Sequence, residues 1–209
     1  NAAPYGAGIL NDKGEVRLYG GRIIGNVAQI GGGIYSDGAE WMWNVIVGYM
    51  GKVEVTSGLI ADNSANAGGG GVFLYGAMDF MGGQIVRNTA SQGGGLLYAN
   101  GSTNFGLTVG GNAVMASNTA PQGSGIFNNN DGYAWLTWQG GGKVVPPNDV
   151  FMAHGLNPIV LAGPLSGRGP AAQLTPAIYE ANQWMLAAAT TNDLWVVSNY
   201  YGKFTVTPA

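Results

Sequence analysis

The chain has 209 residues, of which 46% are hydrophobic and 38 are glycine, and its 8 Lys plus Arg against 11 Asp plus Glu give a net charge of −3. This apolar content excludes a disordered Gly-rich linker, and the sparse, slightly acidic charge argues against a nucleic-acid partner. There is no cysteine, hence no disulfide or thiolate metal site, and no apolar run reaches the roughly 18 to 20 residues of a membrane span.

A sequence repeat occupies the N-terminal part of the chain. Five segments share Asn, Ala two residues later, and Gly five and seven residues later: NAAPYGAGIL at 1, NVAQIGGGIY at 26, NSANAGGGGV at 63, NTASQGGGLL at 88 and NTAPQGSGIF at 118. The last four follow GGRIIG, SGLIAD, GGQIVR and GGNAVMAS. The Asn residues are separated by 25, 37, 25 and 30 positions, so the basic period is 25 residues with two insertions.

The repeat unit is made of short strands. Runs such as RIIGN, GIYSD, VEVTSG, GVFLYG, QIVRN and GLLYAN are apolar or β-branched and are bounded by Gly and Asn, without a helical period. A 25-residue period with about three short strands is typical of one coil of a parallel β-helix. We therefore expect an all-β fold, a right-handed parallel β-helix with coils of about 25 residues, over residues 1–143.

Stacked coils turn the repeat into columns of side chains. We expect an inward Asn ladder at a bend, a column of small Ala side chains, and a core column of Ile23, Ile60, Ile85 and Met115. The residue before each Asn should face solvent, so that Asp62 and Arg87 can pair on adjacent coils. The structural ladder is predicted to contain Asn1, Asn26, Asn63, Asn88 and Asn118.

The repeated glycines predict a sharp turn after the Asn ladder. Each turn should take up positive φ values beside a neighbouring backbone, which glycine permits. The predicted turn glycines are Gly8, Gly33, Gly70, Gly95 and Gly125.

These motifs resemble those of the polymorphic outer-membrane adhesins of chlamydial type, which carry short Gly-Gly-Ala-Ile and Phe-x-x-Asn repeats. GAGI, GGGI, GGGV, GGGL and GSGI are similar to the first element, and IIGN, IADN, IVRN and MASN are similar to the second, with Ile or Met in place of Phe. The resemblance covers residues 1 to about 127 and implies a β-helical fold and a surface location.

The 12-residue insertion, within SDGAEWMWNVIVGYMGK at 36–52, is rich in aromatic residues. Trp41, Trp43 and Tyr49 are candidates for a glycan contact, because sugar rings stack on aromatic faces. The alternative is a longer strand whose large side chains cover the flank of the fold or contact another subunit. A second aromatic group, Tyr133, Trp135 and Trp138, lies where the motif ends and is expected to cap the open end of the coils.

Residues 144–209 differ in composition from the repeats. Prolines cluster between 146 and 170, and the Asn-Ala-Gly motif is absent. The segment resembles the β-rich module that follows Gly/Asn β-helix repeats in large surface proteins of spirochaetes and other anaerobes. We expect it to form a β-rich C-terminal module, with the terminal KFTVTPA available as a strand for β-augmentation of another subunit.

Signals for catalysis, metals and cofactors are weak. His154 is the single histidine, and no GxxxxGK[ST], GxGxxG or GxSxG motif occurs. NNNDG at 128–132 partly matches a calcium-loop start, but the twelfth position is Gln139. The candidate acids for polysaccharide cleavage are Asp37, Glu40, Glu54, Asp62 and Asp79, and the sequence places no two of them on adjacent coils. We expect no catalytic residue, metal or cofactor.

The sequence favours a non-catalytic structural protein, extracellular or on the cell surface, that acts in adhesion or self-assembly. Asn1 lies in the middle of a repeat unit, so either a preceding coil or another subunit would supply the missing half. The expected partners are further copies of the chain, in a homo-oligomer or filament, or a host or microbial surface glycan. A β-helical lyase or hydrolase that binds or degrades polysaccharides is the alternative.

Overall fold

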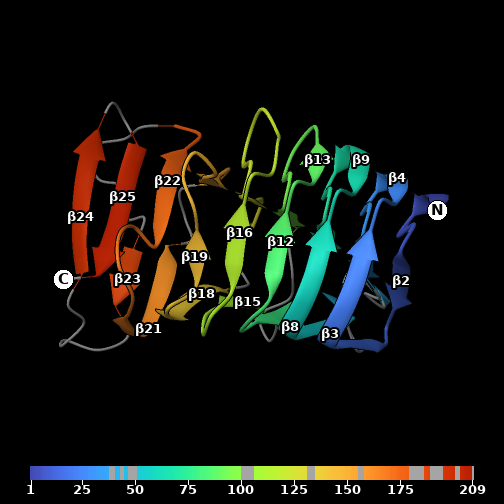
Figure 1. Cartoon of the computed structure of the whole chain (residues 1–209), viewed down its shortest axis with the longest axis horizontal. Coiled ribbons are helices and arrows are strands. Elements are labelled where there is room, and N and C mark those ends of the chain that lie inside the picture. Colours follow the sequence, from blue (N-terminus) through green and yellow to red (C-terminus); the bar gives the residue numbers. More distant parts are fainter. Residues whose placement is uncertain are drawn as a thin grey trace.

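The computed structural model describes residues 1–37, 41–42, 45–46, 51–99, 106–130, 135–154, 158–178, 186–188, 195–200 and 203–208. These residues form strands and turns, with no helix among them. The strands stack along one long axis, with the first strands at one end and the last two at the other (Figure 1). The predicted all-β class is therefore confirmed.

Three long sheets run along this axis. Sheet A contains β1 (Ala2–Tyr5), β4 (Val27–Ile30), β9 (Ser64–Gly68) and β13 (Thr89–Ala90). Sheet B contains β2 (Ile9–Asp12), β5 (Ile34–Asp37), β10 (Val72–Leu74), β14 (Leu96–Tyr98), β17 (Ile126–Asn128), β20 (Val150–Met152), β22 (Ala172–Pro176), β25 (Lys203–Pro208) and β24 (Trp195–Tyr200). Sheet C contains β3 (Glu15–Ile24), β8 (Lys52–Ala61), β11 (Ala77–Phe80), β12 (Gln84–Val86), β15 (Gly106–Val109), β16 (Val114–Ala116), β18 (Trp135–Gly140), β19 (Lys143–Val144), β21 (Ile159–Leu165) and β23 (Leu186–Ala188).

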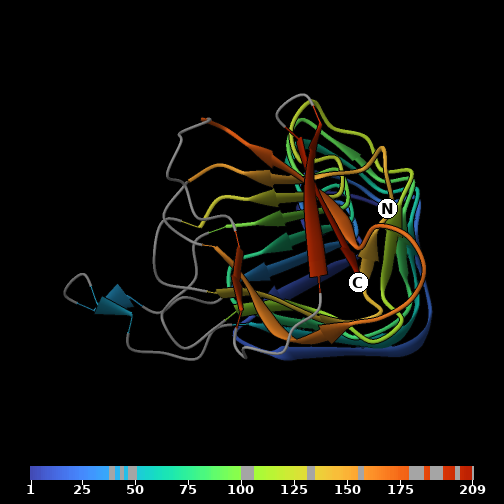
Figure 2. The same ribbon diagram turned by 90° about the vertical axis from the view of Figure 1, so that its left-hand side faces the viewer.

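The chain visits sheets A, B and C in turn and then returns to sheet A one level further along the axis. Each strand consequently pairs in parallel with the equivalent strand of the next level, as β5 does with β10 and β10 with β14. Figure 2, turned by 90° from Figure 1, shows the three sheets around a shared interior. This arrangement is of the parallel β-helix type.

The interior is filled by columns of inward side chains in register. Ile23, Ile60, Ile85 and Met115 occupy successive levels, as predicted, and are between 0% and 9% exposed. Val144 continues the column beyond Met115. Ala28, Ala65 and Ala90 form a second buried column in sheet A. The 3.6-residue period is absent because every second residue of each strand points inward.

A column of buried asparagines joins sheet C to sheet A. Asn26 donates from both its backbone N and its Nδ2 to Oδ1 of Asn63, at 3.0 and 2.9 Å. Asn63 does the same to Asn88, and Asn88 to Asn118. The second Nδ2 hydrogen of Asn63, Asn88 and Asn118 goes to the carbonyl of Ile23, Ile60 and Ile85, at 2.9 to 3.0 Å. At these three levels every amide hydrogen and both oxygen lone pairs are therefore used.

The ends of the Asn column differ from the sequence prediction. Asn1 is exposed, although its carbonyl accepts a bond from the backbone N of Val27. At the other end the column gains Asn148, whose Oδ1 accepts from Asn118. The residue before an Asn of the column has a φ of 55° to 69° at 25, 62, 87 and 117, but before Asn148 it is Pro147, which cannot adopt positive φ. Asn148 lacks the motif, so the repeat pattern did not identify it.

Two kinds of glycine shape the turn from sheet A to sheet B. Positive φ belongs to the first glycine of each turn, at Gly6, Gly31, Gly69, Gly93 and Gly123. The expectation of positive φ was wrong for Gly8, Gly33, Gly95 and Gly125. At these positions glycine is required because a Cβ would collide with neighbouring atoms. A Cβ on Gly95 would lie 2.6 Å from the carbonyl oxygen of Gly125 and 2.9 Å from Nδ2 of Asn118.

The prediction of Gly70 as the equivalent turn glycine was off by one residue. Val72 pairs with Ile34 and with Leu96, so Gly71 stands level with Gly33 and Gly95. The register between β4 and β9 shifts after Ala28, so that Ile30 faces Gly68. This bulge inserts one residue, and the run of four glycines hid it from sequence comparison.

Parallel stacking continues past residue 143, since β20 pairs with β17, β21 with β18 and β22 with β20. The predicted division into 1–143 and 144–209 stays a prediction. Within sheet B, antiparallel pairing begins at β25, which lies between β22 and β24. The terminal strand was expected to pair with another subunit, but both of its edges are paired within the chain.

Replacing Asn88 with Ala should lower the free energy of unfolding by at least about 3 kcal/mol, because the donors of Asn63, the Oδ1 of Asn118 and the carbonyl of Ile60 would remain buried without partners. Asn66→Ala is the matched control: this exposed Asn bonds only Gln29, at 3.1 Å, and should cost less than about 0.5 kcal/mol. Equal losses in urea denaturation would contradict the role given to the column.

Gly95→Val should destabilise the fold by about 2 kcal/mol or more, because the added side chain meets the backbone of the next level. Gly163→Val is the control, since a Cβ there has no atom within 4 Å. Thermal unfolding of the two variants side by side measures the difference. An unchanged transition for Gly95→Val would rule out the register described above.

Candidate functional site

The aromatic insertion predicted as a glycan or subunit contact is only partly described. Trp43 and Tyr49 lie outside the described residues. Trp41 begins β6 (Trp41–Met42), which pairs antiparallel with β7 (Val45–Ile46) in a separate two-stranded sheet. Figure 2 shows these two strands standing apart from the three main sheets. β6 and β7 therefore belong to neither sheet B nor sheet C, between which they lie in the chain.

A column of large apolar side chains runs along the outside of sheet B. Register places Leu10, Tyr35, Phe73, Leu97, Phe127 and Phe151 on successive levels. The rings of Tyr35 and Phe73 stack with centroids 4.9 Å apart and an interplanar angle of 4°, and those of Phe127 and Phe151 stack at 5.2 Å. One face of each of these four rings is thus covered by another ring, so this column stabilises the stack and leaves fewer faces for a sugar.

Burial along this outer column is uneven. Leu97, Phe127 and Phe151 are between 5% and 9% exposed, whereas Leu10 is 60% exposed. Tyr5, at the end of β1, is 51% exposed and its ring lies 5.2 Å from that of Tyr35. The accessible aromatic surface of the described residues on this side is therefore concentrated at the N-terminal levels. Burial and the hydrogen bond of the Tyr35 hydroxyl to Asp37 both raise the pKa of Tyr35 above its usual value.

The outer face of sheet C carries ion pairs. Arg17 lies 2.7 Å from Glu15 and 3.7 Å from Glu54, and Lys52 lies 3.1 Å from Asp79. Glu54 and Asp79 are register partners on β8 and β11. The hydrogen bond to Asp79 raises the pKa of Lys52. The structure thus brings together three carboxylates and two cations on the outer face of sheet C.

This grouping corrects the sequence expectation about the acids. No two candidate acids were expected on adjacent levels, but Glu54 faces Asp79. Asp37 faces Asp12, which was not among the candidates. The residues of each pair are 25 positions apart, the basic period, so the repeat spacing could have identified both pairings. Glu40 lies outside the described residues.

The predicted pair between Asp62 and Arg87 is confirmed. Nε and Nη2 of Arg87 both donate to the Asp62 carboxylate at 2.8 Å. This bidentate bond lowers the pKa of Asp62 and raises that of Arg87. Both side chains are exposed, and their mutual engagement makes Asp62 a poor candidate for a general base.

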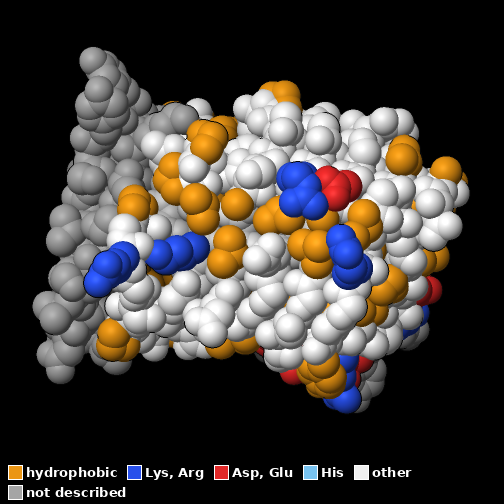
Figure 3. All heavy atoms as spheres, in the orientation of Figure 1, with side chains coloured by type: hydrophobic (Ala, Val, Ile, Leu, Met, Phe, Trp, Pro, Cys, Tyr) orange, Lys and Arg blue, Asp and Glu red, His pale blue; other side chains and the backbone are white. Residues whose placement is uncertain are grey.

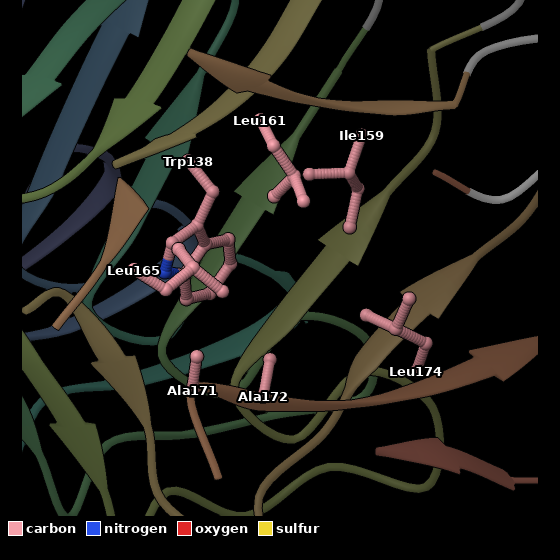
Figure 4. Close-up of a pocket in the computed structure, with 7 residues that line it drawn as sticks. All are labelled: Trp138, Ile159, Leu161, Leu165, Ala171, Ala172 and Leu174. Atoms are coloured by element: carbon pink, nitrogen blue, oxygen red, sulfur yellow. The ribbon is translucent and has the colours of Figure 1, made fainter. Parts of the chain in front are cut away.

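A small apolar hollow of about 10 Å³ lies inside the coils near the C-terminal end. Figure 4 shows its lining: Trp138, Ile159, Leu161, Leu165, Ala171, Ala172 and Leu174. The one polar atom among these side chains, Nε1 of Trp138, donates to the carbonyl of Gly142 at 2.9 Å. Trp138 is therefore a core residue within sheet C, not part of an end cap, while Trp135 on the same strand is 54% exposed. The hollow offers no group that could orient a polar substrate.

The hydroxyl of Tyr98 is buried in the core. It lies near the backbone of Leu107 but makes no hydrogen bond of normal geometry with a described group. Burial raises the pKa of Tyr98 above its usual value, so the phenol is neutral at physiological pH. Tyr98 is fully buried and can reach no substrate.

The remaining candidates lie apart from one another. His154 is exposed. Within the described parts of the chain, no three His, Asp or Glu side chains are grouped as a metal site would require. The same residues include no helix of the length and apolarity needed to cross a membrane.

Comparison of the chain with protein-family models, with curated protein sequences and with solved structures gave no significant match.

Tyr98→Phe should leave the free energy of unfolding unchanged or raise it by up to about 1 kcal/mol, because it removes a buried hydroxyl that lacks a partner. Tyr35→Phe is the comparison, since it deletes the bond to Asp37 at 2.9 Å and should cost about 0.5 to 1 kcal/mol. Urea denaturation of both variants tests this. A loss above about 1 kcal/mol for Tyr98→Phe would mean that its hydroxyl has a strong partner.

Proposed function

We propose that this chain is a non-catalytic structural protein of the cell exterior, acting in adhesion or self-assembly. In this proposal the coils form a right-handed parallel β-helix with a basic coil of about 25 residues, and the C-terminal part serves as a β-rich module. The resemblance of the repeats to those of polymorphic outer-membrane adhesins supports the surface location.

The observation that carries the proposal is the continuity of the columns along the axis. Buried polar side chains are engaged in the Asn column, and the outer column of sheet B repeats large apolar side chains from level to level. Such a stack presents long, rigid, repetitive faces instead of a single concave pocket. Repetition suits an extended partner, whether a polymer or further copies of the chain.

Assembly and adhesion are distinguished by examining the purified protein. Analytical ultracentrifugation and electron microscopy should show either concentration-dependent filaments, which favours assembly, or dispersed particles that are retained by immobilised glycans, which favours adhesion. Dispersed particles that bind no surface glycan or cell would contradict the proposal.

The polysaccharide-degrading alternative has one specific observation in its favour. Glu54 and Asp79 stand on adjacent levels beside Lys52 and Arg17, and paired carboxylates near a cation are the groups that glycan cleavage needs. Incubation with polysaccharides should release no reducing or unsaturated sugars. If sugars are released and Asp79→Asn or Glu54→Gln abolishes the release without unfolding the protein, the chain is an enzyme and the structural proposal is wrong.

A further inference from the structure

The outer face of sheet A differs from every other outer surface described above, because it carries no charge. None of the 19 Lys, Arg, Asp and Glu residues of the chain falls within 1–8, 26–34, 63–72, 88–96 or 118–126. These are the segments that form sheet A and its turns into sheet B. On the side of the molecule drawn in Figure 3, charged side chains are few and form small separate groups.

Two outward columns form this surface, here called the uncharged face. The first column contains Ala2, Val27, Ser64, Thr89 and Thr119, and the second contains Pro4, Gln29, Asn66, Ser91 and Pro121. All of these residues except the half-buried Ser64 are exposed. Hydroxyl and amide groups therefore recur at about 4.8 Å from level to level, the separation of paired strands.

The polar groups of the uncharged face are only lightly engaged with one another. Asn66 donates to Gln29 at 3.1 Å, Gln92 donates to Gln122 at 3.3 Å, and the Ser91 hydroxyl donates to the carbonyl of Ala67. Val27 is 50% exposed and adds apolar surface between the polar groups. At the border with sheet B, Tyr5 adds an aromatic ring that is 51% exposed.

We propose that the uncharged face binds an uncharged polysaccharide that lies along the axis of the coils. This inference rests on the proposed role in adhesion and names the surface and the partner class. Hydroxyl and amide groups exchange hydrogen bonds with sugar hydroxyls, and Val27 and Tyr5 contact the apolar faces of the rings. An anionic polymer finds no cation on this face and meets a chain of net charge −3. A second copy packing sheet on sheet would need interdigitating apolar side chains, whereas this face presents polar side chains at six of its ten positions.

The test measures retention of the purified chain on insoluble cellulose, β-1,3-glucan and chitin, with alginate as the acidic comparison. At least one neutral polymer should retain the protein, and retention should change less than about twofold between low and high salt, because no charge takes part. The variant Gln29→Lys/Ser91→Lys places two charges on the uncharged face. It should weaken binding at least about tenfold, since the ammonium groups lose hydration beneath the polymer.

The matched control is Gln84→Lys/Thr108→Lys, which adds the same charge to the outer face of sheet C. It should bind within about twofold of the unchanged protein, because both variants gain the same long-range charge. Thermal unfolding of the two variants should coincide, which separates a binding defect from a folding defect.

Four results would overturn the inference. Equal binding by both variants would place the glycan on another surface and leave adhesion standing. Preferential, salt-sensitive retention on alginate would assign an acidic ligand. Concentration-dependent association that Gln29→Lys/Ser91→Lys abolishes would assign the uncharged face to a second copy of the chain. Absence of any glycan binding together with absence of assembly would reject the proposed function as well.

Discussion

The buried asparagine column is the interaction on which the rest of the structure depends. Where sheet C turns into sheet A, the backbone leaves the ladder and its amide and carbonyl groups would otherwise be buried without partners. Asn63, Asn88 and Asn118 each satisfy groups on both neighbouring levels. Each level therefore fixes the height and register of the next, and Asp62 and Arg87 adopt positive φ just before the turn. A substitution in the column leaves groups on two levels without partners. Each Asn of the column therefore depends on the Asn of the neighbouring level.

The close stacking at the turn from sheet A to sheet B is a consequence of the Asn column at the turn from sheet C to sheet A. Because the Asn amides hold the levels at strand spacing, the backbone at Gly33, Gly71 and Gly95 lies against the next carbonyl, with room for a hydrogen but not for a Cβ. The entropy lost in ordering these glycines is offset by hydrogen bonds between successive turns. The glycines of this turn are thus required by the close packing of the stack.

The outer faces of the three sheets differ in the kind of side chain that they present. Sheet C carries exposed ion pairs, sheet B carries a stacked aromatic column, and sheet A carries uncharged hydroxyl and amide groups. The charges in the column of Glu54 and Asp79 on sheet C are confined to its N-terminal levels, since Thr108 and Thr137 follow in register. The faces have the same backbone geometry, so their side chains alone decide which partner each can bind.

The repeat by itself determined the all-β class, the parallel stacking of levels, the inward Ile and Ala columns, the Asn column from Asn26 to Asn118 and the pairing of Asp62 with Arg87. These features recur at fixed spacing, and a fixed spacing in sequence becomes a fixed position in a stack. Only the tertiary structure decided the place of Gly71, the addition of Asn148 and the internal pairing of β25. Gly71 follows a bulge, Asn148 follows a proline, and β25 lies where the repeat motif is absent, so none of them stands at a fixed spacing from the repeat. Hydrogen bonding between levels restores the register that the sequence separation alone does not show.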